Sequence, residues 1–464
     1  MTDDGRGQRP GRRDEWDTDE LNLPVDDLRR QPLADDRRAP RRSERGASAD
    51  DGRARPARVA SGPGDRPSRA SRADTRRDRA AVGRKRRSRI IGGLGVLVLV
   101  GLVAVGGVWG VSKFTGGGAA VAEDYPGPGG DAVVVQVASG DTAQEIATEM
   151  ADKDVTASSA AFYEAAVQNT AMTSVQPGFY RMRSQMAASD AVSALVDPAS
   201  RVGQIQIAEG RQLHDSTDVN TGAVRKGIYT LISEASCAVG EGLPCVTYDD
   251  LDLAGAGDDP SALGVADWAT DAVRQVPDRD RQLEGLIAAG TFNFDPSAAP
   301  TDILRQLVSE SAAIYEDTGL LEAGASSGLD PYQVLVASSL IEREALPQDF
   351  AKVARVILNR LAIGQRLEFD STVNYSLDTT EVATTDADRA NVTPWNTYAK
   401  EGLPATPICS PGVAAVQAAE APEPGNWLYF VTINAAGETL FTDDYQVHLD
   451  NITKVEGGFL DSGR

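Results

Sequence analysis

Histidine and cysteine are scarce in this sequence. Its 464 residues include two histidines, His214 and His448, and three cysteines. The histidines lie far apart, and the sequence contains no HExxH motif and no CxxC pair of the kind that commonly holds zinc. We therefore predict that the protein has no metal site and needs no cofactor.

Basic residues are scarce over most of the chain, although not at its start. Residues 1–89 contain 25 Lys and Arg against 17 Asp and Glu, whereas residues 90–464 contain 21 against 51, a net charge of −30. An acidic body of this kind repels phosphate backbones, which excludes nucleic acid as an expected partner. The 1–89 segment has almost no apolar runs, and we expect it to be a disordered tail.

One uncharged apolar run separates the basic tail from the acidic body. It covers residues 90–111 and is long enough, as a helix, to cross the roughly 30 Å of a bilayer's hydrocarbon core. The basic cluster RKRRSR precedes it, whereas a single Lys follows it closely. The positive-inside rule then predicts a single-pass membrane protein with a cytoplasmic N-terminus and a large part outside the cell membrane.

Two of the cysteines belong to one short loop in this external part. Cys237 and Cys245 bound the segment CAVGEGLPC, and disulfides persist on the outer side of the membrane. We expect these two residues to form a disulfide, which would contribute about 2–3 kcal/mol to stability. Cys409 remains, and it is expected to be a small buried residue.

The segment after the membrane span divides by composition into four parts. A Gly- and Pro-rich linker covers 112–130, and residues 131–210 alternate strand-like and helix-like segments, with strands at 133–137 and 177–182. This pattern looks like a LysM-type module, a small fold that grips N-acetylated glycan chains, although a structural module without a ligand fits equally well. Residues 211–300 form an acidic connecting region that reads as helix-rich.

Residues 301–464 show the sharpest periodic patterns. They predict helices at 301–317 and 330–345, the second with Asp330 as N-cap and Pro331 at its first position, and a third over 349–363. A turn with short strands is expected at 364–377, and a β-hairpin around residues 434–437. The predicted fold class is α+β: a LysM-like module and a larger α/β domain behind one membrane helix and a disordered tail.

Two glutamates on the second of these helices are candidates for chemistry. Enzymes that hydrolyse glycans commonly place two carboxylates on opposite sides of the bond. Glu342 and Glu344 cannot form such a pair, because two positions on a helix differ by about 200°. Periodicity does not choose between them, and a single helical Glu is most often a solvated surface residue.

Four sequence blocks carry a specific resemblance. The segments ASSLIEREA, VARVILNRLAIGQRLEFDSTVNY, WNTYAKEGLPATPICSPG and YFVTINAAGETLFTDDYQVH, preceded by LEGLIAAGTFNFDPSAAPTDIL, occur in the order and spacing of the YceG/MltG family of endolytic murein transglycosylases. The blocks cover roughly residues 280–450. Two departures are that Ser410 replaces a usual Asn and that the region of Leu286 lacks the family's Trp and Pro-Asp.

The resemblance implies a membrane-anchored enzyme that cuts nascent peptidoglycan strands between N-acetylmuramic acid and N-acetylglucosamine, helping to terminate strand elongation. The product would carry a 1,6-anhydro end, because the sugar's own 6-hydroxyl attacks in place of water. One acid is then sufficient, and the family's catalytic glutamate corresponds to Glu342. Peptidoglycan, the cell membrane and peptidoglycan synthases are the partners that the resemblance suggests.

The same blocks supply candidate substrate-binding groups with hydroxyl, amide and aromatic side chains that suit N-acetyl sugars. These candidates are Asn359, Arg360, Asp370, Ser371, Thr372, Tyr375, Asn396 and Tyr398. Each has a structural alternative; for example, Arg360 could pair with Glu344. Two other functions remain open at this point: a non-catalytic glycan-binding scaffold, and a hydrolytic muramidase that uses a second carboxylate such as Asp370.

Overall fold

A computed structural model describes residues 122–219, 221–240, 242–377, 379–380 and 384–455. Within these residues, no helix combines the length and the apolar character needed to cross a membrane. The predicted tail at 1–89 and the predicted span at 90–111 lie outside the described residues.

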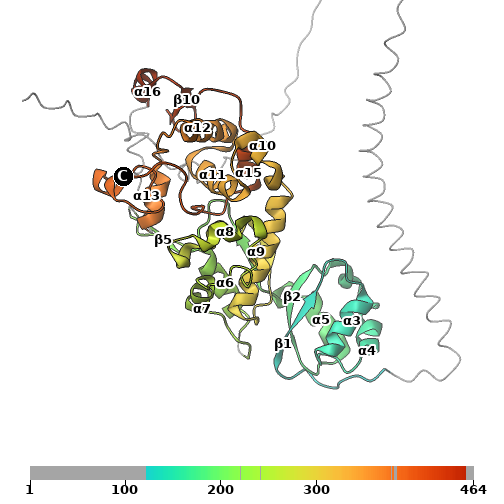
Figure 1. The fold of residues 1–464 in the computed structure, drawn as a ribbon. Helices are drawn as coiled ribbons and strands as arrows, with labels where there is room; N and C mark the ends of the chain where they lie inside the picture. Colours follow the sequence, from blue (N-terminus) through green and yellow to red (C-terminus); the bar gives the residue numbers. More distant parts are fainter. Residues whose placement is uncertain (1–121, 220, 241, 378, 381–383, 456–464) are drawn as a thin grey trace, which may run out of the picture. The chain divides into compact units, whose positions relative to one another are not determined.

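The first described elements form a small α/β unit with its own core (Figure 1). Its antiparallel sheet has the order β1-β2-β3. Its apolar side chains, among them Val135, Met150 and Phe162, are fully buried together. The elements are β1 (Ala132–Val137), α3 (Ala143–Asp152), α4 (Ser159–Ala166), β2 (Gly178–Arg183), α5 (Ala188–Val196) and β3 (Arg201–Val202).

The remaining elements are mostly helical, with three small sheets. Strand β4 pairs antiparallel with β7, β9 pairs with β10, and the third sheet has the order β6-β5-β8. The strands are β4 (Gln204–Ile207), β5 (Ser216–Asp218), β6 (Val224–Arg225), β7 (Gly290–Asn293), β8 (Thr379–Thr380), β9 (Tyr429–Thr432) and β10 (Thr439–Thr442). The helices are α6 (Ile228–Cys237), α7 (Tyr248–Gly255), α8 (Asp267–Arg274), α9 (Pro300–Glu316), α10 (Gly324–Ser327), α11 (Pro331–Glu344), α12 (Phe350–Ala362), α13 (Asp370–Leu377), α14 (Asp386–Ala390), α15 (Val413–Glu420) and α16 (Tyr445–Ile452).

One hydrophobic core joins these elements. Its buried side chains extend along the chain from Ile205 to Phe430, so the 211–300 region contributes to the same core as the helices that follow it. Helix α11 lies inside this core and packs against α15, α12, α8 and α13. Of its 14 residues, 12 are buried, including both glutamates. The sequence predicts an amphipathic helix here, but the structure buries it on every side.

The local predictions for the second half of the chain are mostly confirmed. Asp330 caps α11 through the amide of Gln333 and Pro331 is its first residue, because a short acceptor and a fixed φ both suit a helix start. The hairpin forms as β9 and β10. The expectation of short strands at 364–377 is wrong over 370–377, because these residues form helix α13.

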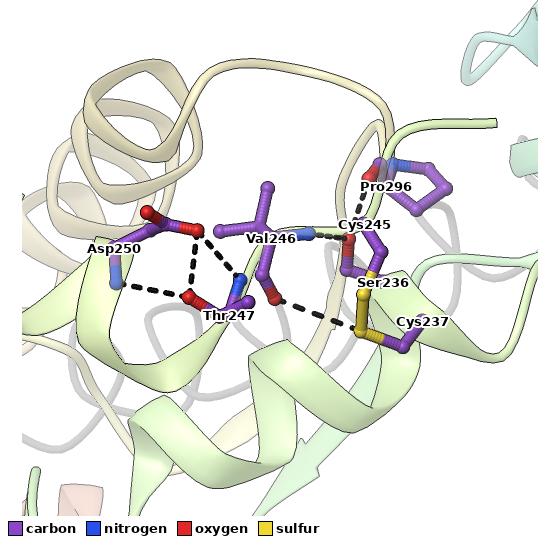
Figure 2. Close-up of a disulfide and its surroundings, with 7 residues drawn as sticks. All are labelled: Ser236, Cys237, Cys245, Val246, Thr247, Asp250 and Pro296. Atoms are coloured by element: carbon purple, nitrogen blue, oxygen red, sulfur yellow. Dashed lines mark hydrogen bonds between the residues drawn. A yellow bond between two sulfur atoms is a disulfide. The ribbon is translucent and has the colours of Figure 1, made fainter.

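Cys237 and Cys245 are joined by a disulfide, with their Cα atoms 4.7 Å apart (Figure 2). The neighbouring Ser236 hydroxyl donates to the carbonyl of Pro296 at 2.6 Å and accepts from the amide of Val246 at 2.9 Å. The end of α6 is thereby fixed to the chain that leads into α7 and to the segment around Pro296. Cys409 is buried, as expected, and its thiol donates to the Ser339 carbonyl at 3.5 Å.

Candidate functional site

Glu342 lies in the last turn of α11 and is 2% exposed. Its Oε2 accepts a hydrogen bond from the backbone N–H of Gly412 at 3.2 Å. Gly412 is the N-cap of α15, so the carboxylate faces the positive end of a helix dipole. Burial favours the neutral acid and the helix end favours the anion. A group that must both donate and recover a proton needs both forms to be accessible.

The chain from Ile408 to Gly412, which we call the 408–412 segment, is held firmly beside α11. The hydroxyl of Ser339, one turn before Glu342, accepts from the amide of Ile408 at 3.0 Å. The carbonyl of Ser410 accepts from the amide of Gly210 at 2.9 Å. The segment therefore lies between α11 and the loop that follows β4.

That loop brings a second carboxylate to the site. An ideal Cβ placed on Gly412 would lie 2.4 Å from Oε1 of Glu209, so the glutamate side chain lies directly against the glycine. Because N and Cβ of one residue are about 2.5 Å apart, the nearest oxygens of Glu209 and Glu342 are at most about 8 Å apart. Glu209 is exposed, in contrast to Glu342.

Glu344 points to a different partner from Glu342, as the helical rotation predicts. It is 5% exposed, and its Oε1 accepts a short hydrogen bond from the hydroxyl of Ser371 on α13. Burial raises its pKa to about 7, and the nearby carboxyl of Asp370 adds to the increase. A single helical glutamate is most often a solvated surface residue, but both Glu342 and Glu344 are buried.

Asp370, the first residue of α13, is the acceptor of a buried polar cluster. Its Oδ1 receives hydrogen bonds from the hydroxyls of Thr384 at 2.6 Å and Tyr398 at 3.0 Å, and Arg389 Nε lies 3.4 Å away. Burial raises the pKa of the Asp370 carboxyl, and the three donors oppose that increase. The cluster fixes α13 to the segments around residues 384–398.

Tyr375, on the same helix, binds a third buried glutamate. Its hydroxyl donates to Glu284 Oε2 at 3.1 Å, and the amide of Leu213 lies 3.3 Å from both Glu284 oxygens. Glu284 is fully buried, which raises its pKa to about 7. The guanidinium of Arg281 lies over the Tyr375 ring, 4.8 Å from its centroid.

The other candidate residues bind backbone or hydroxyl groups of the protein. Asn359 donates to the carbonyls of Gly425 and Trp427. Arg360 donates to those of Leu428 and Leu367, and its Nη1 lies 3.9 Å from Glu368 Oε2. Asn396 donates to three carbonyls between residues 388 and 391. Thr372 contacts the hydroxyl of Thr397.

The structure thus gathers some of the candidates and separates others. Asp370, Ser371, Thr372 and Tyr375 share helix α13, which packs against α11, whereas Asn359 binds the chain that leads into β9. Contact of these residues with a glycan remains a prediction.

Sequence reasoning missed Glu209 and Glu284 as site residues. Both precede a glycine with positive φ, Gly210 at 72° and Gly285 at 73°. In both cases the sequence shows a Glu-Gly pair after an apolar residue. This pattern could have identified the two glutamates, because a glycine of this kind marks a sharp turn that fixes the preceding side chain. One of these turns is built into the core, because a Cβ on Gly285 would lie 2.4 Å from Pro407.

Among the described residues, no group of three or more His, Cys, Asp or Glu side chains is arranged to hold a metal ion. His214 hydrogen-bonds the Tyr248 hydroxyl at 2.6 Å, and His448 stacks on Tyr429 with ring centroids 5.1 Å apart. Burial and the charge of Arg360 lower the pKa of His448 to about 4. Both histidines therefore have contacts of a structural kind.

Known proteins resemble this chain over the region that contains these residues. A relative from Bacillus subtilis (strain 168), described as an endolytic murein transglycosylase, is 25% identical over 323 residues, which cover 68% of this chain and 82% of that protein. A crystal structure of a YceG-like protein from Listeria monocytogenes is 24% identical with a TM-score of 0.43, and the match covers 69% of this chain and 99% of the other. The sequence profile of the YceG-like family matches residues 135–454, more than half of the chain. The resemblance seen in the sequence blocks is thereby confirmed, and this protein belongs to the YceG-like family.

Proposed function

We propose that this protein is an endolytic murein transglycosylase that cleaves glycan strands of peptidoglycan between N-acetylmuramic acid and N-acetylglucosamine. Family membership and the described activity of the Bacillus relative support the reaction. Within this chain, the main support is the position of Glu342. Its carboxyl is almost fully buried and accepts a hydrogen bond from the backbone N–H of Gly412, at the start of α15.

In the proposed reaction Glu342 acts first as the acid. Its proton goes to the glycosidic oxygen, the bond from that oxygen to C1 breaks, and positive charge develops on the muramic acid ring. The oxygen of the 6-hydroxyl then bonds to C1, and its proton returns to the Glu342 carboxylate. The N–H of Gly412 stabilises that carboxylate between the two transfers. The product is a 1,6-anhydro end, and water is not consumed.

We assign Glu344 a supporting role in this scheme. Its carboxyl holds Ser371 and so fixes α13 against α11. The α13 residues Asp370, Ser371, Thr372 and Tyr375, together with Asn359, Arg360, Asn396 and Tyr398, are proposed to shape or line the glycan groove. Where their polar atoms bind other protein groups, they act by fixing the walls of that groove.

We further propose the membrane arrangement that the sequence suggests. Residues 90–111 anchor the chain, the 1–89 tail is cytoplasmic, and the 112–130 linker leads to the catalytic part outside the membrane. The 131–210 module is proposed to bind the glycan strand as a LysM-like unit. Residues 211–300 lead from it to the catalytic domain at 301–464 and share the core of that domain. An anchor of this kind would keep the enzyme beside the synthases that make new strands.

Substitution of the two α11 glutamates tests the assignment. We expect Glu342→Gln to lower the rate of peptidoglycan cleavage by about 10²–10⁴-fold, because an amide cannot donate the proton, with no change in the unfolding midpoint. Glu344→Gln should keep an activity close to that of the unmodified protein, since the amide oxygen still accepts from Ser371. Glu310→Gln, at an exposed position of α9, is the matched control.

A folded Glu342→Gln protein that still cleaves strands would refute this assignment. If Glu344→Gln is the inactive variant, the catalytic role belongs to the opposite side of α11.

A further inference from the structure

A second carboxylate, not needed for the proton transfers just described, lies beside Glu342. Glu209 is 133 positions earlier in the chain, yet its Oε1, Cδ and Cγ lie 2.4, 2.7 and 2.9 Å from the position of a Cβ on Gly412. The same glycine donates its N–H to Glu342. Gly412 thus separates the two carboxylates, and only a residue without a side chain leaves room for both.

The backbone, rather than a side-chain contact alone, holds Glu209 in this position. The amide of Gly210 donates to the Ser410 carbonyl at 2.9 Å, and the amide of Ser410 donates to the Arg211 carbonyl at 2.7 Å. These two bonds make a short antiparallel bridge between the loop and the 408–412 segment. The loop after β4 and the 408–412 segment therefore form one rigid unit that presents Glu209.

Positive groups lie close to the loop that carries Glu209. A Cβ on Gly210 would lie 3.7 Å from a guanidinium nitrogen of Arg225 and 3.9 Å from one of Arg343. The N-terminus of α15 adds the partial positive charge of its dipole. Nearby positive charge of this kind lowers the cost of placing two carboxylates close together.

The two carboxylates differ in a way that suits different tasks. Glu342 is 2% exposed, whereas the side chain of Glu209 is exposed at the surface. Glycan-cleaving sites use such a division, with a buried carboxyl as the acid and a solvated carboxylate as the charge that faces the sugar. Their separation of at most about 8 Å does not exceed the widest spacing, roughly 9.5 Å, at which a carboxylate pair acts on one glycosidic bond.

We propose that Glu209 is a second active-site carboxylate, whose negative charge faces the muramic acid ring and stabilises the oxocarbenium-like transition state. The proposal rests on the function proposed above and adds a group to the same site. Glu209 forms no bond to the sugar and moves no proton. The C1–O bond still breaks with a proton from Glu342, and the 6-hydroxyl oxygen still closes the anhydro ring.

The kinetic test compares Glu209→Gln with the unmodified protein and with the Glu310→Gln control. The glutamine keeps the size of the side chain and removes its charge. Loss of a group that acts mainly in the transition state should lower kcat by about 10²-fold and leave KM and the unfolding midpoint unchanged. Glu209→Asp, which keeps the charge, should recover part of the activity. An unchanged kcat in Glu209→Gln would overturn the proposal.

A binding test separates a charge effect from a structural effect and does not depend on cleavage. Titration calorimetry measures the affinity for a cationic iminosugar that mimics the N-acetylglucosamine ring, and for a neutral oligomer of N-acetylglucosamine. We expect Glu209→Gln to weaken binding of the cation at least tenfold and to leave the neutral oligomer unaffected. Equal weakening of both ligands, or of neither, would overturn the proposal.

Failure of the proposed function gives a different result. An unmodified protein that yields reducing ends, or no cleavage at all, contradicts the transglycosylase assignment whatever Glu209 does.

Discussion

Replacement of Glu284 by glutamine should make the protein less sensitive to pH. Glu284 is fully buried, accepts hydrogen bonds from the Tyr375 hydroxyl and the Leu213 amide, and has a pKa raised to about 7 by burial. A raised carboxyl pKa means that the folded state binds the proton more tightly than the unfolded state. Below about pH 4.5 both states are protonated and the burial has no ionisation cost. As the pH rises from about 4.5 to about 7, the unfolded state ionises first and stability falls.

The size of this effect follows from the difference between the two pKa values. A folded-state value of about 7 lies about 2.5 pH units above the ordinary 4.5, which corresponds to about 3 kcal/mol lost by pH 7.5. The glutamine that replaces Glu284 cannot ionise, and its amide oxygen can still accept from the same two donors. The free energy of unfolding of Glu284→Gln, relative to the unmodified protein, should therefore rise by about 3 kcal/mol between pH 4.5 and 7.5.

Urea unfolding followed by tryptophan fluorescence at a series of pH values measures this difference. Glu310→Gln serves as the control, because its side chain is exposed in the folded protein. A constant difference between Glu284→Gln and the unmodified protein across this range would show that the expectation is wrong. It would mean that water or a rearranged donor solvates the carboxylate as well in the folded state as in the unfolded one.

Two further substitutions test the site and the disulfide. Gly412→Ala places a Cβ 2.4 Å from Glu209 Oε1, so the carboxylate must move by about 1 Å. A displacement of that size should lower kcat by about 10²-fold. The control is Gly127→Ala, whose Cβ would have no neighbour closer than 3.9 Å, and it should leave kcat unchanged. The double variant Cys237→Ser and Cys245→Ser should lose about 2–3 kcal/mol of unfolding free energy in urea titrations, because it frees a loop closed at a separation of 8 residues, with kcat unchanged. Full activity in Gly412→Ala, or unaltered stability in the serine variant, would contradict these expectations.

Local chemistry made several elements predictable from the sequence. The start of α11 needs only a short acceptor at Asp330 and a proline after it, and the hairpin needs only alternating strands around a Gly-containing turn. Helix α13 was not predictable in this way. Its sequence DSTVNYSL contains β-branched residues and few strong helix formers, and six of its eight residues are buried, so tertiary packing overrides propensity.

Part of the site was also predictable from local geometry. The rotation between Glu342 and Glu344 follows from helix geometry, and they do bind partners on different segments, Gly412 and Ser371. Their burial could not be predicted, because it depends on the other helices that pack around α11, among them α15, α12, α8 and α13. The approach of Glu209 to Gly412 could not be predicted either, because it depends on the bridge between two segments about 200 residues apart.

The mass of the ends that the unmodified protein creates tests the proposed reaction without any substitution. Purified peptidoglycan strands are digested, and the new muramic acid termini are identified by mass spectrometry. We predict 1,6-anhydro termini, lighter by one water than reducing termini, and their absence in digests with Glu342→Gln. Reducing termini in digests with the unmodified protein would contradict the proposed mechanism, because they require water as the nucleophile.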